Sequence, residues 1–450
     1  MRRRRALPAA LVGIWLLSLV PAPSPAGGGV VSPRVTLTNP DADDQDDLCV
    51  WIHPTDPSLS TLIVSDKESD HLFVYDLQGN RLQALPTPGR PGNVDLRYGF
   101  PRDGGPVDIV VCNDRTDDRI LVYRVDPTTR SLSRIDGDDL LSAGSYGMCL
   151  YRSPGTGDFH VFTTTQGGLI RQFELADGPS GLAATLVRSW DLGDITEGCV
   201  ADDGTGLVYF AEEDEGIWRF GAEPGDPVTG TRIASVGDGS GLQDDVEGLA
   251  LYYLAGGQGY LLASSQGTDT FHVYDRAPPH APVTEFMVQG VTNTDGIEVT
   301  NVPLGPEFPF GLFACHDDSD SPKPIQVCAY EDLGLSIDTE SWDPRVGVVT
   351  NVEPVPPPSA PRDLAAWPNP FGGGTELRFR MPGTGAAILD VVDTAGRRVT
   401  RLHDGPAPAS WRGVRWDGRD ERGRRAPAGV YFVVLETAAG RTATRVTLIR

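Results

Sequence analysis

Lysine is almost absent from this sequence. Lys67 and Lys323 are its two lysines, and 38 basic residues stand against 62 acidic ones, which gives a formal net charge of −24. A field of this sign repels nucleic acids and other polyanions unless cations lie between them. The charge therefore excludes direct binding of nucleic acid and directs attention to cations as partners.

Several common catalytic and metal-binding patterns are also missing. The seven histidines form no HxH or HExxH pattern, and the six cysteines form no CxxC pair, so the usual zinc sites are excluded. We find no GxSxG, no P-loop and no EF-hand loop. A serine hydrolase of the α/β type, a P-loop nucleotide enzyme and a helical calcium sensor thus lose their usual support.

Long apolar runs are confined to the N-terminus. Four arginines precede an apolar stretch from Ala6 to about Val20, and small residues lead to a cleavage site near Ala26. This pattern predicts a signal peptide over residues 1–26, and the stretch is too short for a comfortable membrane span. We therefore expect a secreted protein, whether extracellular, periplasmic or attached to the cell surface, without a transmembrane anchor.

An oxidising compartment would allow the six cysteines to form up to three disulfides. Cys315 and Cys328 flank a predicted hairpin, and we predict a disulfide between them. The other four lie on apolar runs of four successive repeats, where a buried free thiol and a disulfide are about equally expected. They are Cys49, Cys112, Cys149 and Cys199.

A short β-type run with an aromatic residue recurs six times, at intervals of about fifty residues. A four-stranded propeller blade needs roughly 40–50 residues, so each interval holds one blade. The spacing predicts an all-β fold with a six-bladed β-propeller over residues 35–350. The repeated aromatics are Tyr75, Tyr123, Phe173, Phe220, Tyr274 and Tyr330.

The chain changes character after the repeats. Residues 351–362 are rich in proline and predict an extended linker. Residues 363–450 show alternating apolar runs and glycine-bearing turns, which predict a small β-sandwich domain. Residues 361–450 hold fifteen arginines and nine acids, so the negative charge belongs to the first part of the chain.

Acidic residues of the first part gather in short groups within different repeats. A propeller brings one class of loop from every blade to the same face, so these groups can meet around the axis. Converging carboxylates repel one another, and Ca²⁺, which accepts six to eight oxygen ligands, is the cation that suits them. The groups are Asp43, Asp44, Asp46 and Asp47; Glu197, Asp202 and Asp203; Glu212, Glu213, Asp214 and Glu215; Asp244, Asp245 and Glu247; Asp295; and Asp317, Asp318 and Asp320.

The acidic groups lie in strings that resemble the β-propeller phytases, in the order of that family and over about residues 35–350. Each string is weak alone, and the ordered series is strong. The strings are DDLCVWIHP (46–54), NVDLRYGFP (93–101), NDR (113–115), YGMCLYRSPGTG (146–157), LVRSWDLGDITEGCVADD (186–203), LVYFAEEDEGIWRFGAEPG (207–225), DDVEGLALYY (244–253), GYLLASSQG (259–267) and TNTDGIEV (292–299).

The resemblance implies a secreted phosphatase, a 3-phytase, that removes phosphate from myo-inositol hexakisphosphate (phytate). It also implies that several Ca²⁺ ions hold the fold and perform chemistry at an acidic channel mouth. Asp47 would belong to a structural calcium site. The ligands of the remaining ions and of water would be Asp46, Glu197, Glu213, Asp245, Glu247, Gln266 and Asp295.

The same resemblance assigns phosphate partners to Lys67, Arg115 and Tyr146, and catalytic roles to these three together with Glu197 and Glu213. Taken alone, Arg115 is typical of a surface salt bridge and Tyr146 of blade packing. Their place in the ordered series favours phosphate binding, because guanidinium binds phosphate oxygens bidentately and phenol donates a hydrogen bond.

One string departs from the family pattern. Where the family usually has a Lys-Glu pair, this sequence has Gln166 and Gly167, which removes one expected phosphate cation. Arg171 follows five residues later, and we expect the alternation of a strand to point it away from the face of Gln166. With Gln166 and Arg171 as the substrate-binding residues here, we expect weaker phytate binding or a preference for lower inositol phosphates.

The strings WPNPF (367–371), WDGRDERG (416–423) and AGVYFVVL (428–435) resemble the immunoglobulin-like C-terminal domains that serve sorting or surface attachment in secreted bacterial proteins. The expected partner of residues 363–450 is secretion or cell-surface machinery.

Two alternatives to the phosphatase stay open. One is another six-bladed calcium hydrolase, of the lactonase or phosphotriesterase type. The other is a calcium-stabilised binding or adhesion propeller. Neither would release phosphate from phytate.

Overall fold

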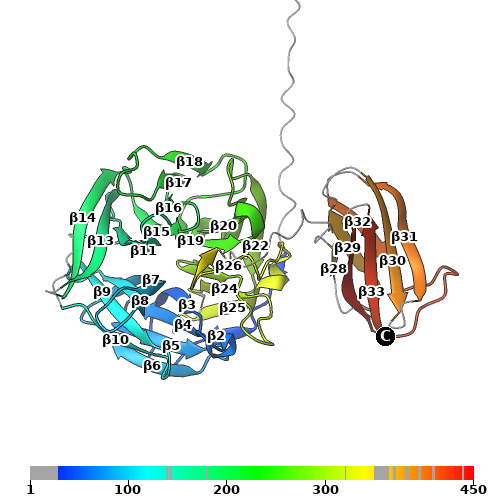
Figure 1. Ribbon diagram of the computed structural model, residues 1–450, viewed down its shortest axis with the longest axis horizontal. Helices are drawn as coiled ribbons and strands as arrows, with labels where there is room; N and C mark the ends of the chain where they lie inside the picture. The colour runs from blue at the N-terminus through cyan, green and yellow to red at the C-terminus, as the bar shows by residue number, and fades with distance from the viewer. Residues whose placement is uncertain are drawn as a thin grey trace, which may run out of the picture. The chain divides into compact units, whose positions relative to one another are not determined.

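The computed structural model describes residues 29–137, 140, 144–178, 181–319, 321–348, 364–367, 371–380, 385–393, 397–407, 411–437 and 440–449. The predicted signal peptide and the predicted linker lie outside the described residues. The chain divides into two compact units, Met1–Val349 and Thr350–Arg450. Figure 1 shows the strands of the first unit arranged as blades around a centre.

Four blades of the first unit are four-stranded antiparallel meanders in chain order. Their first three strands are β-branched and aromatic runs that are buried on both faces, and exposed side chains appear mainly in the outermost strand of each blade. Their strands are β3 (Gln45–Trp51), β4 (Thr61–Asp66), β5 (His71–Asp76) and β6 (Arg81–Pro86); β7 (Pro91–Phe100), β8 (Val107–Asp114), β9 (Arg119–Asp126) and β10 (Ser131–Arg134); β11 (Met148–Arg152), β12 (Phe159–Thr163), β13 (Leu169–Gly178) and β14 (Gly181–Asp191); and β15 (Thr196–Asp202), β16 (Leu207–Glu212), β17 (Gly216–Gly221) and β18 (Thr231–Ser235).

The last two blades recruit strands from the start of the unit. The fifth is β19 (Val246–Tyr253), β20 (Gly259–Ser265), β21 (Thr270–Asp275) and β22 (Pro282–Val288), to which β1 (Val30–Val31) adds in parallel. The sixth is β23 (Ile297–Thr300), β24 (Leu312–His316) and β25 (Ile325–Ala329), and β2 (Val35–Leu37) supplies its fourth strand. The antiparallel pairing of β2 with β25 closes the ring. The predicted six-bladed all-β fold is confirmed.

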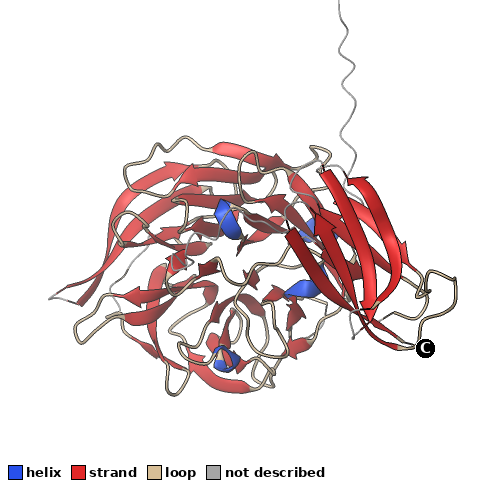
Figure 2. Ribbon diagram, turned by 45° about the vertical axis from the view of Figure 1, so that its right-hand side comes forward, coloured by secondary structure: helices blue, strands red, loops and turns tan. Residues whose placement is uncertain are grey.

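Helical structure is minor, as Figure 2 shows. The described residues contain no α-helix, and their four 3₁₀ turns are η1 (Pro57–Leu59), η2 (Ala255–Gly257), η3 (Gln266–Thr268) and η4 (Tyr330–Leu333). None of their helices is long and apolar enough to cross a membrane.

The repeated aromatics occupy equivalent places. Five of the six lie in the third strand of their blade, and each is at most 6% exposed, so they pack between neighbouring blades. The sixth, Tyr330, lies just beyond its third strand, in η4, where its ring stacks on Tyr252 with centroids 3.6 Å apart. The repeated aromatic residue is thus buried between blades in all six repeats, although in the sixth it lies outside the strand.

The first strand of every blade lines a central channel. Figure 1 shows β3, β7, β11, β15 and β19 innermost, and residues of β23 complete the wall of a cavity of about 140 Å³. At the end of the channel where these strands finish, Trp342 of β26 (Trp342–Asp343) joins the lining. Its ring stacks on Tyr253 with centroids 4.1 Å apart. β26 pairs with β27 (Gly347–Val348).

The second unit is the expected small sandwich. One sheet contains β28 (Leu364–Trp367), β29 (Thr375–Arg380) and β32 (Trp411–Trp416). The other contains β31 (Arg398–Ala407), β30 (Gly385–Asp393), β33 (Gly429–Thr437) and β34 (Gly440–Leu448). Its core includes Phe371, Leu389, Trp416 and Val433, all at most 2% exposed.

The predicted disulfide is wrong. Cys315 and Cys328 are free, because the β24–β25 register places Cys315 opposite Gln326 and Cys328 opposite Phe313. The structure instead joins Cys149 to Cys199, whose Cα atoms are 5.7 Å apart on the inner strands of the third and fourth blades. Cys49 and Cys112 are buried thiols. Closing a loop of about 50 residues is expected to stabilise the fold by about 4 kcal/mol.

The ring closure generates a first prediction. Leu37 of β2 is fully buried in the core shared by the first and sixth blades, so Leu37→Ala should cost about 2–4 kcal/mol of unfolding free energy. Leu59, which is 40% exposed, is the matched control, and Leu59→Ala should cost under about 0.5 kcal/mol. Urea unfolding followed by tryptophan fluorescence measures both. Equal midpoints would show that β2 is not needed to hold the ring.

Candidate functional site

The antiparallel meander explains how distant residues meet at one end of the channel. In each blade the start of the first strand lies beside the end of the second, as in the pairs Gln45 with Asp66 and Thr196 with Glu212. Residues at either position therefore face the same end, which we call the mouth. Apart from Arg171, which lies in the third strand β13, the predicted site residues occupy these two positions, and together they represent all six blades.

A β-bulge recurs where the inner strands begin. The register shifts between Gln45 and Leu48 in β3, and the same shift occurs at the start of β7, β15 and β19. A bulge adds one residue to a strand and redirects its side chains, and bulges are common beside active sites. Asp46, Glu197 and Glu247 lie within these bulges, which accounts for charged side chains on strands that are otherwise apolar.

Three glutamates meet at the mouth. Glu197 of β15, Glu213 directly after β16 and Glu247 of β19 each offer a carboxylate oxygen, and these oxygens all lie within 4.8 Å of one another. Glu197 and Glu247 are less than 9% exposed. Residues up to fifty positions apart in the sequence thus form one anionic cluster. The placement of the acidic groups in loops of different repeats predicted that they would meet.

Arg115 partly compensates this cluster. Its guanidinium, directly after β8, forms an ion pair with Glu197 and lies 3.7 Å from Asp46 Oδ2. The guanidinium carbon also lies 4.7 Å from the ring centroid of Tyr146, which directly precedes Gly147 at the start of the third blade. Arg115 and Tyr146 therefore stand together beside the glutamates.

Lys67 organises the other half of the mouth. Its Nζ lies 2.6 Å from Asp46 Oδ1 and 3.1 Å from Asp295 Oδ2. Gln266, at the start of η3, donates from Nε2 to Asp295 Oδ1 over 2.6 Å. Asp46 thus links the two halves, with one oxygen toward Lys67 and the other toward Arg115.

Two predicted metal ligands stand apart from these contacts. The carboxylate of Asp47 accepts hydrogen bonds from the Val94 N–H at 3.0 Å and from Asn93 Nδ2 at 3.3 Å, and it lines the channel below the mouth. Asp245 has a left-handed backbone with φ of 56° and is half-buried. Its charge is close enough to raise the pKa of Glu213.

Gln166 lies in the turn between β12 and β13 and is exposed. This turn joins the second and third strands, as do the turns that hold Lys67, Arg115 and Glu213, so Gln166 faces the mouth. The expectation that strand alternation separates it from Arg171 does not apply, because Gln166 precedes β13. Arg171 pairs in register with Thr163 and Ser189, and its Nη1 lies 3.7 Å from where a Cβ on Gly144 would stand.

Sequence reasoning missed His316 and a set of glycines. His316, fully buried at the end of β24, accepts a hydrogen bond at Nδ1 from the Asp295 N–H over 3.1 Å. A glycine follows Tyr146, Glu197, Glu247 and Asp295 in turn, and a Cβ on any of the four would lie within 2.5 Å of an atom of the next blade. The recurring pairs YG, EG, EG and DG were the available signal.

Burial, followed by the crowding of negative charge, governs the titration of the mouth. Burial, with Glu197 and Asp245, raises the pKa of Glu213 to about 7. Burial and Asp46 raise the pKa of Asp295 to about 8, against the lowering effect of Lys67. Burial opposes ionisation of Asp46 as well, yet Lys67 and Arg115 hold its pKa below the usual range.

The donor set fits a hard cation. Glu213 Oε1 is buried and has no hydrogen-bond partner among the described residues, and the cluster offers carboxylate and amide oxygens without sulfur. Such oxygens are the ligands of hard divalent cations. An uncompensated buried carboxylate is costly, and a divalent cation removes that cost.

Comparison with known proteins decides the family. The model of the phytase family matches residues 32–329. The chain belongs to the phytase family. It is 39% identical over 298 residues to the 3-phytase of Bacillus subtilis (strain 168), a match that covers 63% of this chain and 77% of the relative.

Solved structures resemble this phytase-family chain more remotely. Regucalcin, a calcium-binding protein from Agrobacterium tumefaciens, is 12% identical with a TM-score of 0.41, over 67% of this chain and 97% of its own. PorZ of Porphyromonas gingivalis, a surface component of a type-IX secretion system, is 13% identical with a TM-score of 0.39. That match covers 89% of this chain and 51% of PorZ. Neither likeness bears on function.

The titration of the mouth generates a second prediction, for protein stripped of metal with EDTA. The raised pKa values of Glu213 and Asp295 mean that the native state binds more protons than the unfolded chain between about pH 4 and pH 8. Stability must therefore fall as pH rises through this window. Thermal unfolding should show a lower midpoint at about pH 8 than at about pH 5, and excess Ca²⁺ should narrow the difference.

The double variant Glu213→Gln/Asp295→Asn, which cannot titrate at these positions, is the control and should show a flatter profile. A midpoint that rises toward pH 8 in the metal-free protein would contradict the charge crowding.

Proposed function

We propose that the propeller hydrolyses the phosphate monoesters of phytate in a Ca²⁺-dependent reaction and releases inorganic phosphate. The observation that carries the proposal is the glutamate cluster beside Arg115 at the channel mouth of a phytase-family chain. Membership of the family and the relationship to a 3-phytase support the enzyme class, a phosphoric monoester hydrolase.

The residues proposed to hold Ca²⁺ and its water are Asp46, Glu197, Glu213, Asp245, Glu247, Gln266 and Asp295, with Asp47 at a separate structural ion. When bound there, Ca²⁺ would offset the negative field, polarise phosphoryl oxygens and lower the pKa of a bound water. Several ions are needed, since phytate itself is polyanionic and this part of the chain repels it.

Arg115, Tyr146 and Lys67 are proposed to bind the phosphoryl group. Arg115 uses one edge for Glu197 and has further N–H groups for two phosphate oxygens. Tyr146, held beside it, donates its phenolic O–H, and burial with the nearby Glu197 keeps the pKa of Tyr146 above its usual value, so the donor stays protonated. Lys67 adds a compact positive charge from the other half of the mouth.

Glu213 is suited to the attacking water. Its unpartnered Oε1 can accept a hydrogen bond from water and then a proton. The water oxygen bonds to phosphorus as the bond from phosphorus to the inositol oxygen breaks. The water supplies one proton to Glu213, and the inositol oxygen leaves as an alcohol after protonation from solvent. Arg115 stabilises the charge that gathers on the phosphoryl oxygens. No phosphoenzyme is required.

We also propose that the protein is secreted. The leader-like residues 1–26 support secretion, and the resemblance of residues 363–450 to sorting domains supports attachment through secretion or surface machinery. The sandwich fold of the second unit suits such a role without defining a partner.

The third prediction tests this function directly. Purified mature protein, stripped with EDTA, should release phosphate from phytate only when millimolar Ca²⁺ is restored. Arg115→Ala should lower kcat/KM by about 10²–10³-fold because transition-state charge loses a donor. Arg124, an exposed arginine on β9 of the same blade, provides the control, and Arg124→Ala should match the wild type.

Folding must be checked in the same samples by thermal unfolding with Ca²⁺. Absence of release from phytate and from lower inositol phosphates, in folded protein, would refute the phosphatase and favour the calcium-stabilised binding propeller.

The fourth prediction concerns substrate preference. Gln166 occupies the turn equivalent to those of Lys67 and Arg115, so Gln166→Lys should add a phosphate cation and lower KM for phytate several-fold, about threefold to tenfold. Gln258→Lys adds the same charge on an exposed turn between β19 and β20, which belongs to the opposite end of the channel. It should leave KM unchanged. Unaltered kinetics of Gln166→Lys on all inositol phosphates would remove Gln166 from the substrate site.

A further inference from the structure

Six junctions between neighbouring blades surround the mouth, and five are joined there by hydrogen bonds. These bonds fix neighbouring blades to one another at the level of the site residues. They run from Val94 N to Asp47 Oδ2 at 3.0 Å, from Asn113 Nδ2 to Tyr146 O at 3.1 Å, from Val246 N to Glu213 O at 3.1 Å, from Gly248 N to Asp295 O at 3.0 Å and from Gly296 N to Asp46 O at 3.1 Å.

The junction between the third and fourth blades is built differently. In the described part of the chain, no backbone hydrogen bond joins residues 146–148 to residues 197–198. The strands nevertheless approach closely, because a Cβ on Gly147 would lie 1.9 Å from the carbonyl oxygen of Glu197. The Cys149–Cys199 disulfide supplies the connection at this junction.

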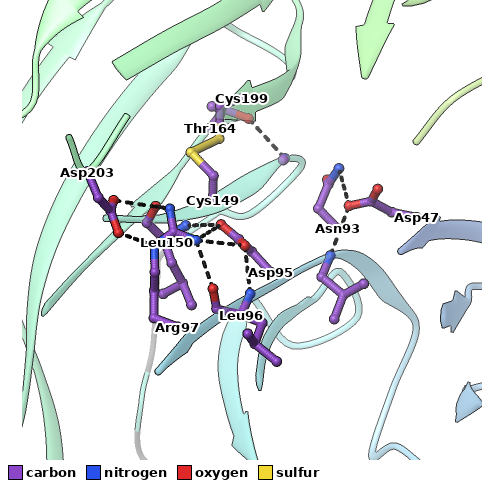
Figure 3. The surroundings of a disulfide bond; sticks show 12 residues. Asp47, Asn93, Asp95, Leu96, Arg97, Cys149, Leu150, Thr164, Cys199 and Asp203 are labelled. Carbon is purple, nitrogen blue, oxygen red and sulfur yellow. Dashed lines mark hydrogen bonds and ion pairs between the residues drawn. A yellow bond between two sulfur atoms is a disulfide. The ribbon is translucent and has the colours of Figure 1, made fainter. Parts of the chain in front are cut away.

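The disulfide lies directly below the site. Cys149 is three residues after Tyr146, and Cys199 is two residues after Glu197. Figure 3 shows the bond between the two inner strands, with Asp47 and Asn93 on a neighbouring stretch of the channel wall. Both cysteines line the channel. The bond therefore ties the strand that carries a phosphate donor to the strand that carries a central glutamate.

Farther from the mouth, charged groups hold the same strands. Arg97 forms ion pairs with Asp95 at 2.9 Å and Asp203 at 2.8 Å, and its Nη2 donates to Leu150 O at 2.6 Å. Asp203 also accepts from the Arg152 N–H at 3.1 Å. Figure 3 shows the contacts of Arg97 with Asp95, Leu150 and Asp203. Together with the bond from Arg152, they would keep the blades assembled if the disulfide were opened.

We propose that the Cys149–Cys199 disulfide is a positioning element of the mouth, which holds Tyr146 and Glu197 at their working separation. The oxidised chain then binds Ca²⁺ and phytate fully, and the reduced chain binds them more weakly while it stays folded. The expected change in phytate hydrolysis rests on the proposed function. The expected change in Ca²⁺ affinity follows from the position of Glu197 alone.

The physical reason is the repulsion within the glutamate cluster. Glu197 contributes both to that cluster and to the ion pair with Arg115, so a shift of its strand disturbs both. A displacement of about 1 Å at a catalytic group can cost up to about 10²-fold in rate. With the covalent bond opened, the two strands keep the close packing at Gly147 and the contacts of Arg97 and Asp203 farther from the mouth. They lose the one covalent restraint on their separation beside Tyr146 and Glu197.

The test compares oxidised wild type, wild type reduced by a dithiol and the same sample reoxidised. The dithiol gives two electrons and two protons to the Cys149–Cys199 bond and closes to its own disulfide. Two readouts are taken: the Ca²⁺ concentration that gives the half-maximal rise in thermal midpoint, and kcat and KM for phytate. The double variants Cys149→Ala/Cys199→Ala and Cys149→Val/Cys199→Val separate the covalent link from the volume it fills.

We expect reduction and both double variants to raise the half-maximal Ca²⁺ concentration and KM by about threefold to tenfold, with recovery on reoxidation. Cys315→Ala/Cys328→Ala, which alters two buried free thiols in the sixth blade, should keep wild-type values. Circular dichroism establishes that each sample is folded, and the reduced wild type replaces any variant that fails to fold.

Unchanged Ca²⁺ response and KM in the folded reduced protein, or wild-type values in the valine variant, would overturn the proposal. If oxidised wild type releases no phosphate, the proposed function fails separately, and the Ca²⁺ response still decides the role of the disulfide.

Discussion

Repulsion among carboxylates at the channel mouth is the constraint on which the rest of this structure depends. Glu197, Glu213 and Glu247 would separate if their strands were free to move, and Lys67 and Arg115 neutralise only part of their charge. The bulges that direct Glu197 and Glu247 inward, and the glycines that let neighbouring backbones touch, both oppose that separation. Such a concentration of negative charge attracts cations more strongly than an ordinary protein surface does.

The propeller provides the rigidity that the mouth requires. Each blade packs aromatic and branched side chains against two neighbours, and Trp51, Phe73 and Tyr75 show how completely these layers are buried. The hydrogen bonds between neighbouring blades then transmit this rigidity to the site residues. The positions of the acidic groups follow from the architecture, since the start of a first strand and the end of a second strand lie side by side in every blade.

Much of this arrangement could be predicted from the sequence, because local patterns determined it. The spacing of Tyr75, Tyr123 and the later aromatics predicted the blades, and the acidic strings predicted which loops meet. The register between paired strands could not be predicted from such local patterns. A shift of two residues between β24 and β25 decides that Cys315 faces Gln326, and no local signal shows that Cys149 and Cys199 lie on adjacent inner strands. The alternation argument for Arg171 failed because the strand begins after Gln166.

The strand that closes the ring also orders events during synthesis. Residues Val35–Leu37 are made early, but their partner, Ile325–Ala329, follows almost three hundred residues later. Until then the nascent chain holds an unpaired edge and an incomplete sixth blade, a state that favours aggregation. The acidic first part of the chain, with its net negative charge, would keep such partly made molecules apart. The charge that prepares the mouth for cations could thus also protect the protein before the ring exists.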